Sequence, residues 1–192
     1  MSISSENKII AKSALQAFGG SPKVNKYWDD QHKSSIDILS ASDRPYEGVS
    51  SYSTLNLSDY SIDLLIDEKP LTIEIVGACY TEFNLFSNVL STCAFNIINS
   101  NYSCAPGVIF RDVLKMYYPN TEMEHILFAP PFLWEESLKT IEFSNKCVTW
   151  LLAVPISEKE YHYAEEHGPE NLEKLFEHEK IDIFNIERKS VL

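Results

Sequence analysis

Two apolar runs and a helix-start signal in the last third of the chain give its clearest hydrophobic pattern. Residues 126–129 form a short apolar run that ends at Pro130-Pro131, because proline has no N–H to donate to a strand ladder. Residues 147–154 are almost wholly apolar over eight positions, which predicts a strand buried on both faces and ended by Pro155. The segment Ser157–Glu160 has the spacing of a capping box. The pattern therefore predicts a central strand that leads into a capped helix.

Helical periodicity occurs in further segments. Residues 5–18 place their apolar side chains on one stripe, and Gly19-Gly20 supplies the stop. Residues 82–99 predict the most apolar helix, which we expect to be buried on a sheet because four asparagines interrupt it. The capping box opens an acidic helix over residues 157–167, and a second acidic helix follows over residues 169–179.

Alternation of polar and apolar positions predicts the remaining strands. Residues 36–40 have the pattern of an edge strand. Residues 49–57 carry hydroxyl groups on both faces, which favours side-chain hydrogen bonds or the border of a wet surface over a dry core. Residues 62–66 and 71–75 predict two antiparallel strands joined through residues 67–70.

Composition and charge limit the classes of partner. The 192 residues predict one domain, 1–192, with enough apolar side chains for a packed core. The formal net charge of −12, with only three arginines, disfavours nucleic acid and anionic membranes and favours a basic partner. No signal peptide or membrane-spanning run is evident. The four cysteines form no C-x-x-C, so we expect reduced core thiols in a cytoplasmic protein.

Motifs for catalysis, metals or cofactors are not found, so the sequence predicts no catalytic residues, no metal and no cofactor. Cys79 could be a nucleophile but fits a small packing residue better, and Glu74 could be a buried catalytic carboxylate but fits the solvent face of a strand. His125 fits a solvated strand end. For Arg111 we expect a structural ion pair with Asp112 or a glutamate.

The two acidic helices are the remaining global feature. From residue 157 to residue 180 there are eight glutamates and three lysines. Such a face can simply be solvated, or it can be an acidic recognition surface, because complementary charge speeds association and selects partners. The candidate partner-binding residues on it are Glu165, Glu166, Glu170, Glu173 and Glu177.

Several segments taken together resemble bacterial members of the suppressor-of-fused family. The resemblance rests mainly on GVSSYSTLNLS at residues 48–58, LFAPPFLW at residues 127–134 and VTWLLAVPIS at residues 148–157. It continues in residues 172–176 and 181–190, so that it spans roughly residues 5 to 190. The resemblance implies an α/β (α+β) domain in which helices flank a mixed central sheet. The family supplies no catalytic motif to carry over.

The same resemblance implies a binding protein. The bacterial relatives look like immunity proteins, or antitoxins, and this chain is similar to the Bacillus-type antitoxins that neutralise LXG-domain toxins, often nucleases. A toxin with a basic nuclease domain is then the expected partner, since an acidic inhibitor can compete for its substrate cleft. The alternatives are a general protein-interaction module without a toxin partner, and an unrecognised enzyme that uses Glu74 or Cys79.

Overall fold

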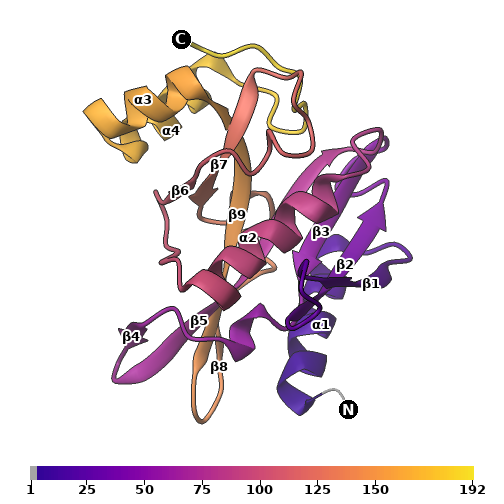
Figure 1. Ribbon diagram of the computed structural model, residues 1–192. Helices are drawn as coiled ribbons and strands as arrows, with labels where there is room; N and C mark the ends of the chain where they lie inside the picture. The colour runs from indigo at the N-terminus through magenta and orange to yellow at the C-terminus, as the bar shows by residue number, and fades with distance from the viewer. Residues whose placement is uncertain (1–3) are drawn as a thin grey trace.

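The computed structural model describes residues 4–192, and a nine-stranded mixed sheet organises them (Figure 1). The strands are β1 (Lys23–Trp28), β2 (Ser35–Ser42), β3 (Val49–Thr54), β4 (Leu64–Ile66), β5 (Lys69–Tyr80), β6 (Ile109–Phe110), β7 (Met123–Ala129), β8 (Ile141–Glu142) and β9 (Cys147–Ser157). Their order is β1-β2-β3-β5-β9-β7-β6, with β4 beside β5 and β8 beside β9. The helices are α1 (Ser5–Phe18), α2 (Phe86–Ser100), α3 (Glu158–His167) and α4 (Pro169–Glu179), and two short 3-10 helices are η1 (Leu57–Asp59) and η2 (Phe132–Trp134).

Strand β9 lies at the centre of the sheet, as its apolar run predicts. It runs parallel to β5, with the register Leu71↔Cys147 to Val76↔Leu152, and antiparallel to β7. The other pairings in the sheet are antiparallel. Helices cover both faces of this sheet, so that the buried, almost wholly apolar β9 matches the expectation for a strand with no solvent face.

The prediction that Pro155 ends this strand is wrong, because β9 continues to Ser157 and Pro155 pairs with Ile126 of β7. The pairing with the parallel partner β5 ends at Leu152, so no strand pairs with that side of β9 at Pro155. The Pro155 carbonyl points there and accepts a hydrogen bond from Arg188 Nη2 at 3.0 Å. The N–H and carbonyl of one strand residue share a side, so the missing proline N–H removes no ladder bond.

The helices divide into two layers, and Figure 1 shows α2 lying across the front of the sheet. On the α2 side, Phe86, Val89 and Leu90 pack in one core cluster with side chains of the sheet. On the opposite side, α1 and α4 contribute to a second core cluster around Trp150. Gly77 allows the close approach of α2, because a Cβ there would lie 2.7 Å from the Phe86 ring. The predicted mixed sheet flanked by helices is therefore confirmed.

Strand β2 is an interior strand between β1 and β3, and not the edge strand that its sequence predicts. Edge strand β1 exposes most of its side chains and covers the ladder of β2. All six residues of β3 are buried, and its serine and threonine hydroxyls make hydrogen bonds; for example, Ser51 Oγ donates to the Arg44 carbonyl, and Ser50 bonds Thr81. The prediction of side-chain hydrogen bonds for this strand is thus confirmed. Helix α2 begins at Phe86, four residues after its predicted start.

Within residues 4–192 no helix combines the length and the apolar content that crossing a membrane requires.

Replacing Trp150 with alanine should destabilise the fold by about 3–5 kcal/mol, because the side chain is 1% exposed and its removal leaves a cavity beside β9. Urea unfolding of the purified variant measures this loss. Trp28→Ala is the matched control, since Trp28 is 50% exposed on the edge strand and its truncation should cost no more than about 1 kcal/mol. Equal losses in the two variants would contradict the placement of Trp150 in the core.

Candidate functional site

A buried ion pair fixes where the two acidic helices lie. Ser157 and Glu160 form the predicted capping box at the start of α3: Glu160 N donates to Ser157 Oγ at 3.1 Å, and Ser157 N donates to Glu160 Oε2 at 2.9 Å. The Glu160 carboxylate, which is fully buried, also accepts hydrogen bonds from both terminal nitrogens of Arg188, at 2.7 and 2.8 Å. Such a bidentate pair fixes geometry as well as charge. The C-terminal segment is therefore fastened to the first turn of α3.

Arg188 extends this contact to two neighbouring elements. Its Nη2 donates to the carbonyl of Pro155 in β9, and its guanidinium lies 5.2 Å from the ring centre of Phe176 in α4. Val191 N donates a hydrogen bond to Glu160 Oε1. The hydrogen-bonding capacity of the buried carboxylate is thus well satisfied, which a buried charge requires. Helix α4 is held over the end of β9 by these contacts.

The structure brings together three of the five predicted partner-binding glutamates. Glu170, Glu173 and Glu177 follow one another on one side of α4 at spacings of three and four residues, and we call them the acidic stripe. Glu165 and Glu166 are exposed at the carboxyl end of α3, where Glu166 pairs with His167 at 3.8 Å. We call all five together the acidic surface.

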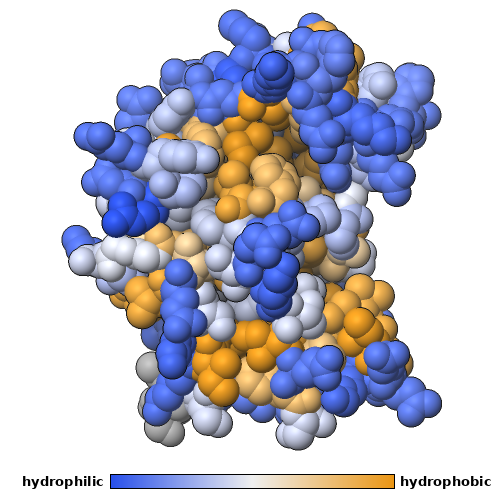
Figure 2. Space-filling model, turned by 180° about the vertical axis from the view of Figure 1, so that it is seen from behind, coloured by the Kyte–Doolittle hydropathy of each residue, from blue (hydrophilic) through white to orange (hydrophobic). Residues whose placement is uncertain are grey.

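An apolar groove runs beside the acidic stripe. It has a volume of about 320 Å³, and in the view from behind apolar side chains lie at the bottom of a hollow between hydrophilic ones (Figure 2). Its lining residues are Leu127, Ala129, Phe132, Val154, Glu173, Phe176, Glu177, Lys180, Ile181 and Ile183. The sequence could not indicate this groove, because three separate segments of the chain form it.

The electrostatics of the acidic stripe reflect its position at the groove. Partial burial raises the pKa of Glu173, and the negative charges of Glu170 and Glu177 raise that pKa further. Lys180 is the one cation among the lining residues. The carboxylates of the stripe thus repel one another and would gain from a cation placed over the groove.

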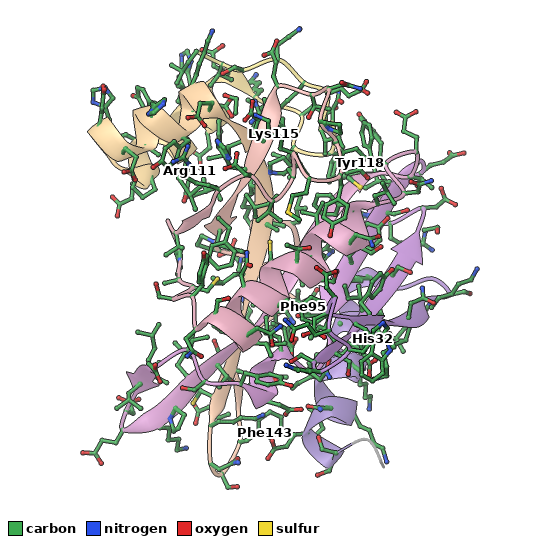
Figure 3. The ribbon with its side chains drawn as sticks, in the orientation of Figure 1. His32, Phe95, Arg111, Lys115, Tyr118 and Phe143 are labelled. Atoms are coloured by element: carbon green, nitrogen blue, oxygen red, sulfur yellow. The ribbon has the colours of Figure 1, made fainter. Side chains whose placement is uncertain are left out.

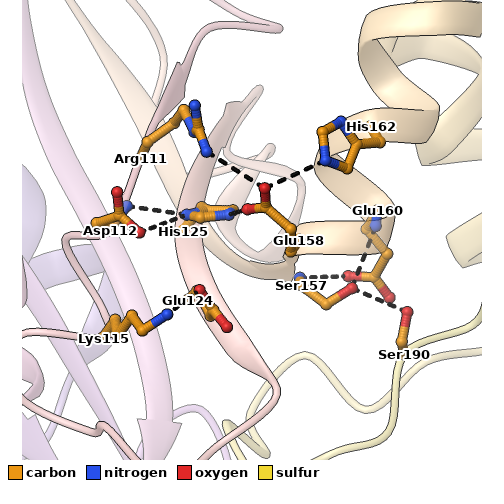
Figure 4. A network of polar contacts seen from close by, with 10 residues as sticks. All are labelled: Arg111, Asp112, Lys115, Glu124, His125, Ser157, Glu158, Glu160, His162 and Ser190. Atoms are coloured by element: carbon orange, nitrogen blue, oxygen red, sulfur yellow. Dashed lines mark hydrogen bonds and ion pairs between the residues drawn. The ribbon is translucent and has the colours of Figure 1, made fainter.

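A second polar network joins the β6–β7 region to the start of α3 (Figure 4). His125 is completely buried, so the expectation of a solvated strand end is wrong. Its Nδ1 accepts the backbone N–H of Asp112 at 2.8 Å, which leaves the proton on Nε2 for donation to Glu158 Oε2 at 2.5 Å. The hydrogen bond from His125, followed by the positive charge of Arg111, lowers the pKa of Glu158.

Arg111 completes this network. It pairs with Glu158 at 3.2 Å and lies 4.6 Å from the ring centre of Tyr161, so that the predicted structural ion pair with a glutamate is confirmed. His162 contacts the same carboxylate at 3.2 Å. The network fastens the start of α3 to β7.

The same residues do not form a free metal or base site. Asp112, Glu124 and His125 are the one group of potential metal ligands found among residues 4–192. The Nδ1 lone pair of His125, however, already accepts the Asp112 N–H, and its Nε2 is engaged by Glu158. Glu124 pairs with Lys115 at 2.7 Å. Both imidazole nitrogens therefore serve the fold.

Glu74 is fully buried, so its expected place on a solvent face is wrong. Its carboxylate accepts hydrogen bonds from Thr54 Oγ1 at 2.5 Å and from the backbone N–H groups of Leu57 and Ser58 at 3.2 and 3.0 Å. Burial nevertheless raises its pKa to about 7, against the effect of these donors. Glu74 thus holds η1 against β5.

All four cysteines are buried and free, which agrees with the expectation of core thiols. Cys79 packs in the α2-side core, and burial raises the pKa of its thiol to about 12. A thiol with such a pKa is almost entirely protonated near neutral pH and is a poor nucleophile. Its geometry fits the packing role.

A larger and more polar cleft of about 590 Å³ lies along α2. Phe95 on α2 and Arg111 beside β6, both labelled in Figure 3, are among its lining residues. Asparagines of α2 and exposed aromatic residues such as Trp28 and Tyr102 line the rest. The charged residues among its lining are Asp29, Asp30 and Arg111.

Comparisons with known proteins find a matching family and a full-length relative. The model of the family described as suppressor of fused protein (SUFU) matches residues 32–189. A protein of Bacillus subtilis (strain 168) named "Immunity protein YqcF" is 60% identical over 192 residues, which cover the whole of both chains.

Solved structures agree on the fold. A putative SUFU homolog from Neisseria gonorrhoeae FA 1090 is 14% identical with a TM-score of 0.71, and the match covers 97% of both chains. A chain in a structure titled "the Sufu-Fu complex crystal structure" is 13% identical with a TM-score of 0.68, and the match covers 97% of this chain and 92% of that one. At these identities the likeness concerns the fold alone, and it confirms the expected suppressor-of-fused-like architecture.

Replacing Glu74 with glutamine should change how stability depends on pH. Between about pH 4.5 and 7 the folded protein holds a proton on Glu74 that the unfolded chain has released, so this group lowers the free energy of unfolding as pH rises. The contribution approaches about 1 kcal/mol per pH unit. We therefore expect the stability of the wild type relative to Glu74→Gln to fall between pH 5 and pH 7 in urea unfolding. A pH-independent difference would contradict the raised pKa.

Replacing Arg188 with methionine should destabilise the fold by about 3–5 kcal/mol, because it leaves the buried Glu160 carboxylate without its cation. The double variant Glu160→Met with Arg188→Met should recover part of that loss. Lys189→Met is the control, since the exposed pair of Lys189 with Glu122 is worth less than about 1 kcal/mol. Urea unfolding measures all three, and a loss for Arg188→Met no larger than for the control would refute a structural role of the pair.

Proposed function

We propose, because this chain belongs to the suppressor of fused protein family and has an immunity protein as a full-length relative, that it is itself an immunity protein that binds and neutralises a toxin. The observation that carries the proposal is the identity of 60% over the whole of both chains, which leaves no segment of either chain unmatched. A protein with this function works by covering a surface of its partner. It performs no chemistry.

Three features of the molecule support binding over catalysis. Glu74 and Cys79, the two residues considered for an enzyme, are buried in contacts that hold the fold together. His125 has both ring nitrogens engaged. The large charge of −12 and the acidic surface favour a cationic protein over nucleic acid or an anionic membrane. We also propose that the protein acts in the cytoplasm.

We further propose that the partner is a nuclease domain of an LXG-type toxin. A nuclease binds a polyanion and therefore presents a basic cleft, and the acidic surface on α3 and α4 is complementary to such a cleft in charge. Occupation of the cleft by carboxylates would exclude the nucleic-acid substrate. The five residues of the acidic surface are then the first contacts of the encounter.

Co-expression tests the proposed function directly. The gene beside the one for this chain should encode a larger protein with a C-terminal toxin domain, and this chain should restore growth to cells that express that domain. The readout is colony formation with and without the chain, with Arg188→Met as a destabilised control that should rescue less. Failure of the wild type to rescue cells, at normal abundance, would leave a general interaction module as the better description.

Charge reversal tests the acidic surface. Reversal of its five glutamates to lysine removes most of the formal net charge and should slow association with the toxin domain at least tenfold at low ionic strength. Surface plasmon resonance measures the rate, and the effect should shrink at high salt because screening acts over about 8 Å at physiological ionic strength. The matched control reverses five exposed acidic residues elsewhere: Asp30, Glu47, Glu68, Glu82 and Glu142. Equal slowing in both sets would mean that the association rate depends on the total net charge and not on the position of the glutamates on α3 and α4.

A further inference from the structure

The apolar groove beside α4 is the strongest candidate for a docking site among the described residues. Its floor is formed by Leu127, Ala129 and Val154, which are 0%, 2% and 4% exposed and come from β7 and β9. Phe176 of α4 forms one wall. Phe132 of η2 stands at the groove with half of its surface, 51%, open to solvent. An aromatic ring so exposed beside an apolar hollow gives up contact with water when another apolar group covers it.

Charge at the rim selects the kind of group that can cover it. Glu173 and Glu177 border the groove on the α4 side, and Glu170 precedes them on the same stripe. Lys180 is the one cationic residue among those that line the groove. An incoming segment with acidic residues would be repelled, whereas a lysine or arginine next to its apolar residue would reach the rim carboxylates.

We infer that this groove receives an apolar side chain of the toxin domain that is flanked by lysine or arginine on the same segment. The inference rests on the proposed function and adds to it the place and chemistry of the contact. The acidic stripe would steer and orient the segment, while burial of the apolar side chain against Phe132 and Phe176 would supply the affinity. Binding of this kind uses the groove as the centre of the interface and the stripe as its rim.

A second copy of this chain is the less favourable occupant. In a two-fold symmetric dimer the same patch faces itself, so the acidic stripes of both copies would be brought together across the groove. Like charges brought together and desolvated oppose association. Charge complementarity therefore favours the basic partner.

Phe132→Asp tests the apolar part of the contact. It places a carboxylate at the groove and should weaken binding of the toxin domain at least about tenfold, as expected for an aromatic residue at the centre of an interface. Isothermal titration calorimetry measures the dissociation constant. Leu65→Asp is the matched control, since Leu65 is an exposed apolar residue, 70% accessible, on β4 outside the groove. Its dissociation constant should stay within about twofold of the wild type.

A thiol-reactive fluorophore gives an independent readout. Because the four native cysteines are buried, a cysteine introduced at exposed Lys180 will be labelled selectively. We expect the emission of an environment-sensitive label there to shift to the blue when the toxin domain is added. The same label on Leu65→Cys should not respond. Thermal unfolding midpoints of all variants test whether they are folded, and elution volumes test whether they are monomers.

The outcomes separate the groove from the proposed function. If the wild type and Leu65→Asp bind while Phe132→Asp binds weakly and the Lys180→Cys label responds, the groove is the docking site. If Phe132→Asp binds and rescues like the wild type, the groove inference is overturned and the immunity function stands. If the wild type neither binds nor rescues, both fall. A wild type that elutes as a dimer, and Phe132→Asp as a monomer, would assign the groove to self-association and overturn the inference as well.

Discussion

The pair between Glu160 and Arg188 is the interaction on which the C-terminal half of the molecule depends. A carboxylate completes the capping box of α3 and at the same time binds the guanidinium that fastens the end of the chain. That guanidinium in turn contacts β9 and the Phe176 ring of α4. Because these contacts use the same two charges, one buried ion pair links the start of α3, the end of the chain, β9 and α4, which carries the acidic stripe and borders the groove.

Ionisable groups in this protein serve two different purposes according to their burial. Glu74, Glu160 and His125 are inside, where each accepts or donates hydrogen bonds that hold a turn or a helix start in place. The glutamates of the acidic stripe stand outside or half-buried, and few cations neutralise them. A buried charge needs its partner within the chain, whereas an exposed carboxylate that lacks one is available to another molecule.

The sequence predicts those parts of the molecule whose cause is local. The Ser157–Glu160 capping box, the buried β9 and the acidic helices each follow from residues within one short segment. Burial of Glu74 and His125 could not be predicted, because their partners come from η1 and from Glu158, distant in sequence. The prediction that β2 is an edge strand is wrong for a related reason. Alternation of polar and apolar residues shows that one face of a strand is covered, but it does not show whether another strand, such as β1, pairs with its edge.

The contact between Arg188 and the Pro155 carbonyl has a consequence for the backbone of the central strand. Beyond Leu152 no strand pairs with the side of β9 that faces away from β7, so its backbone groups there need other partners. Proline removes the donor there, and the guanidinium occupies the acceptor. At Pro155 this side of β9 therefore offers neither a free donor nor a free acceptor. The same arginine that contacts α3 and α4 thus also satisfies the backbone of the central strand where its parallel partner no longer pairs with it.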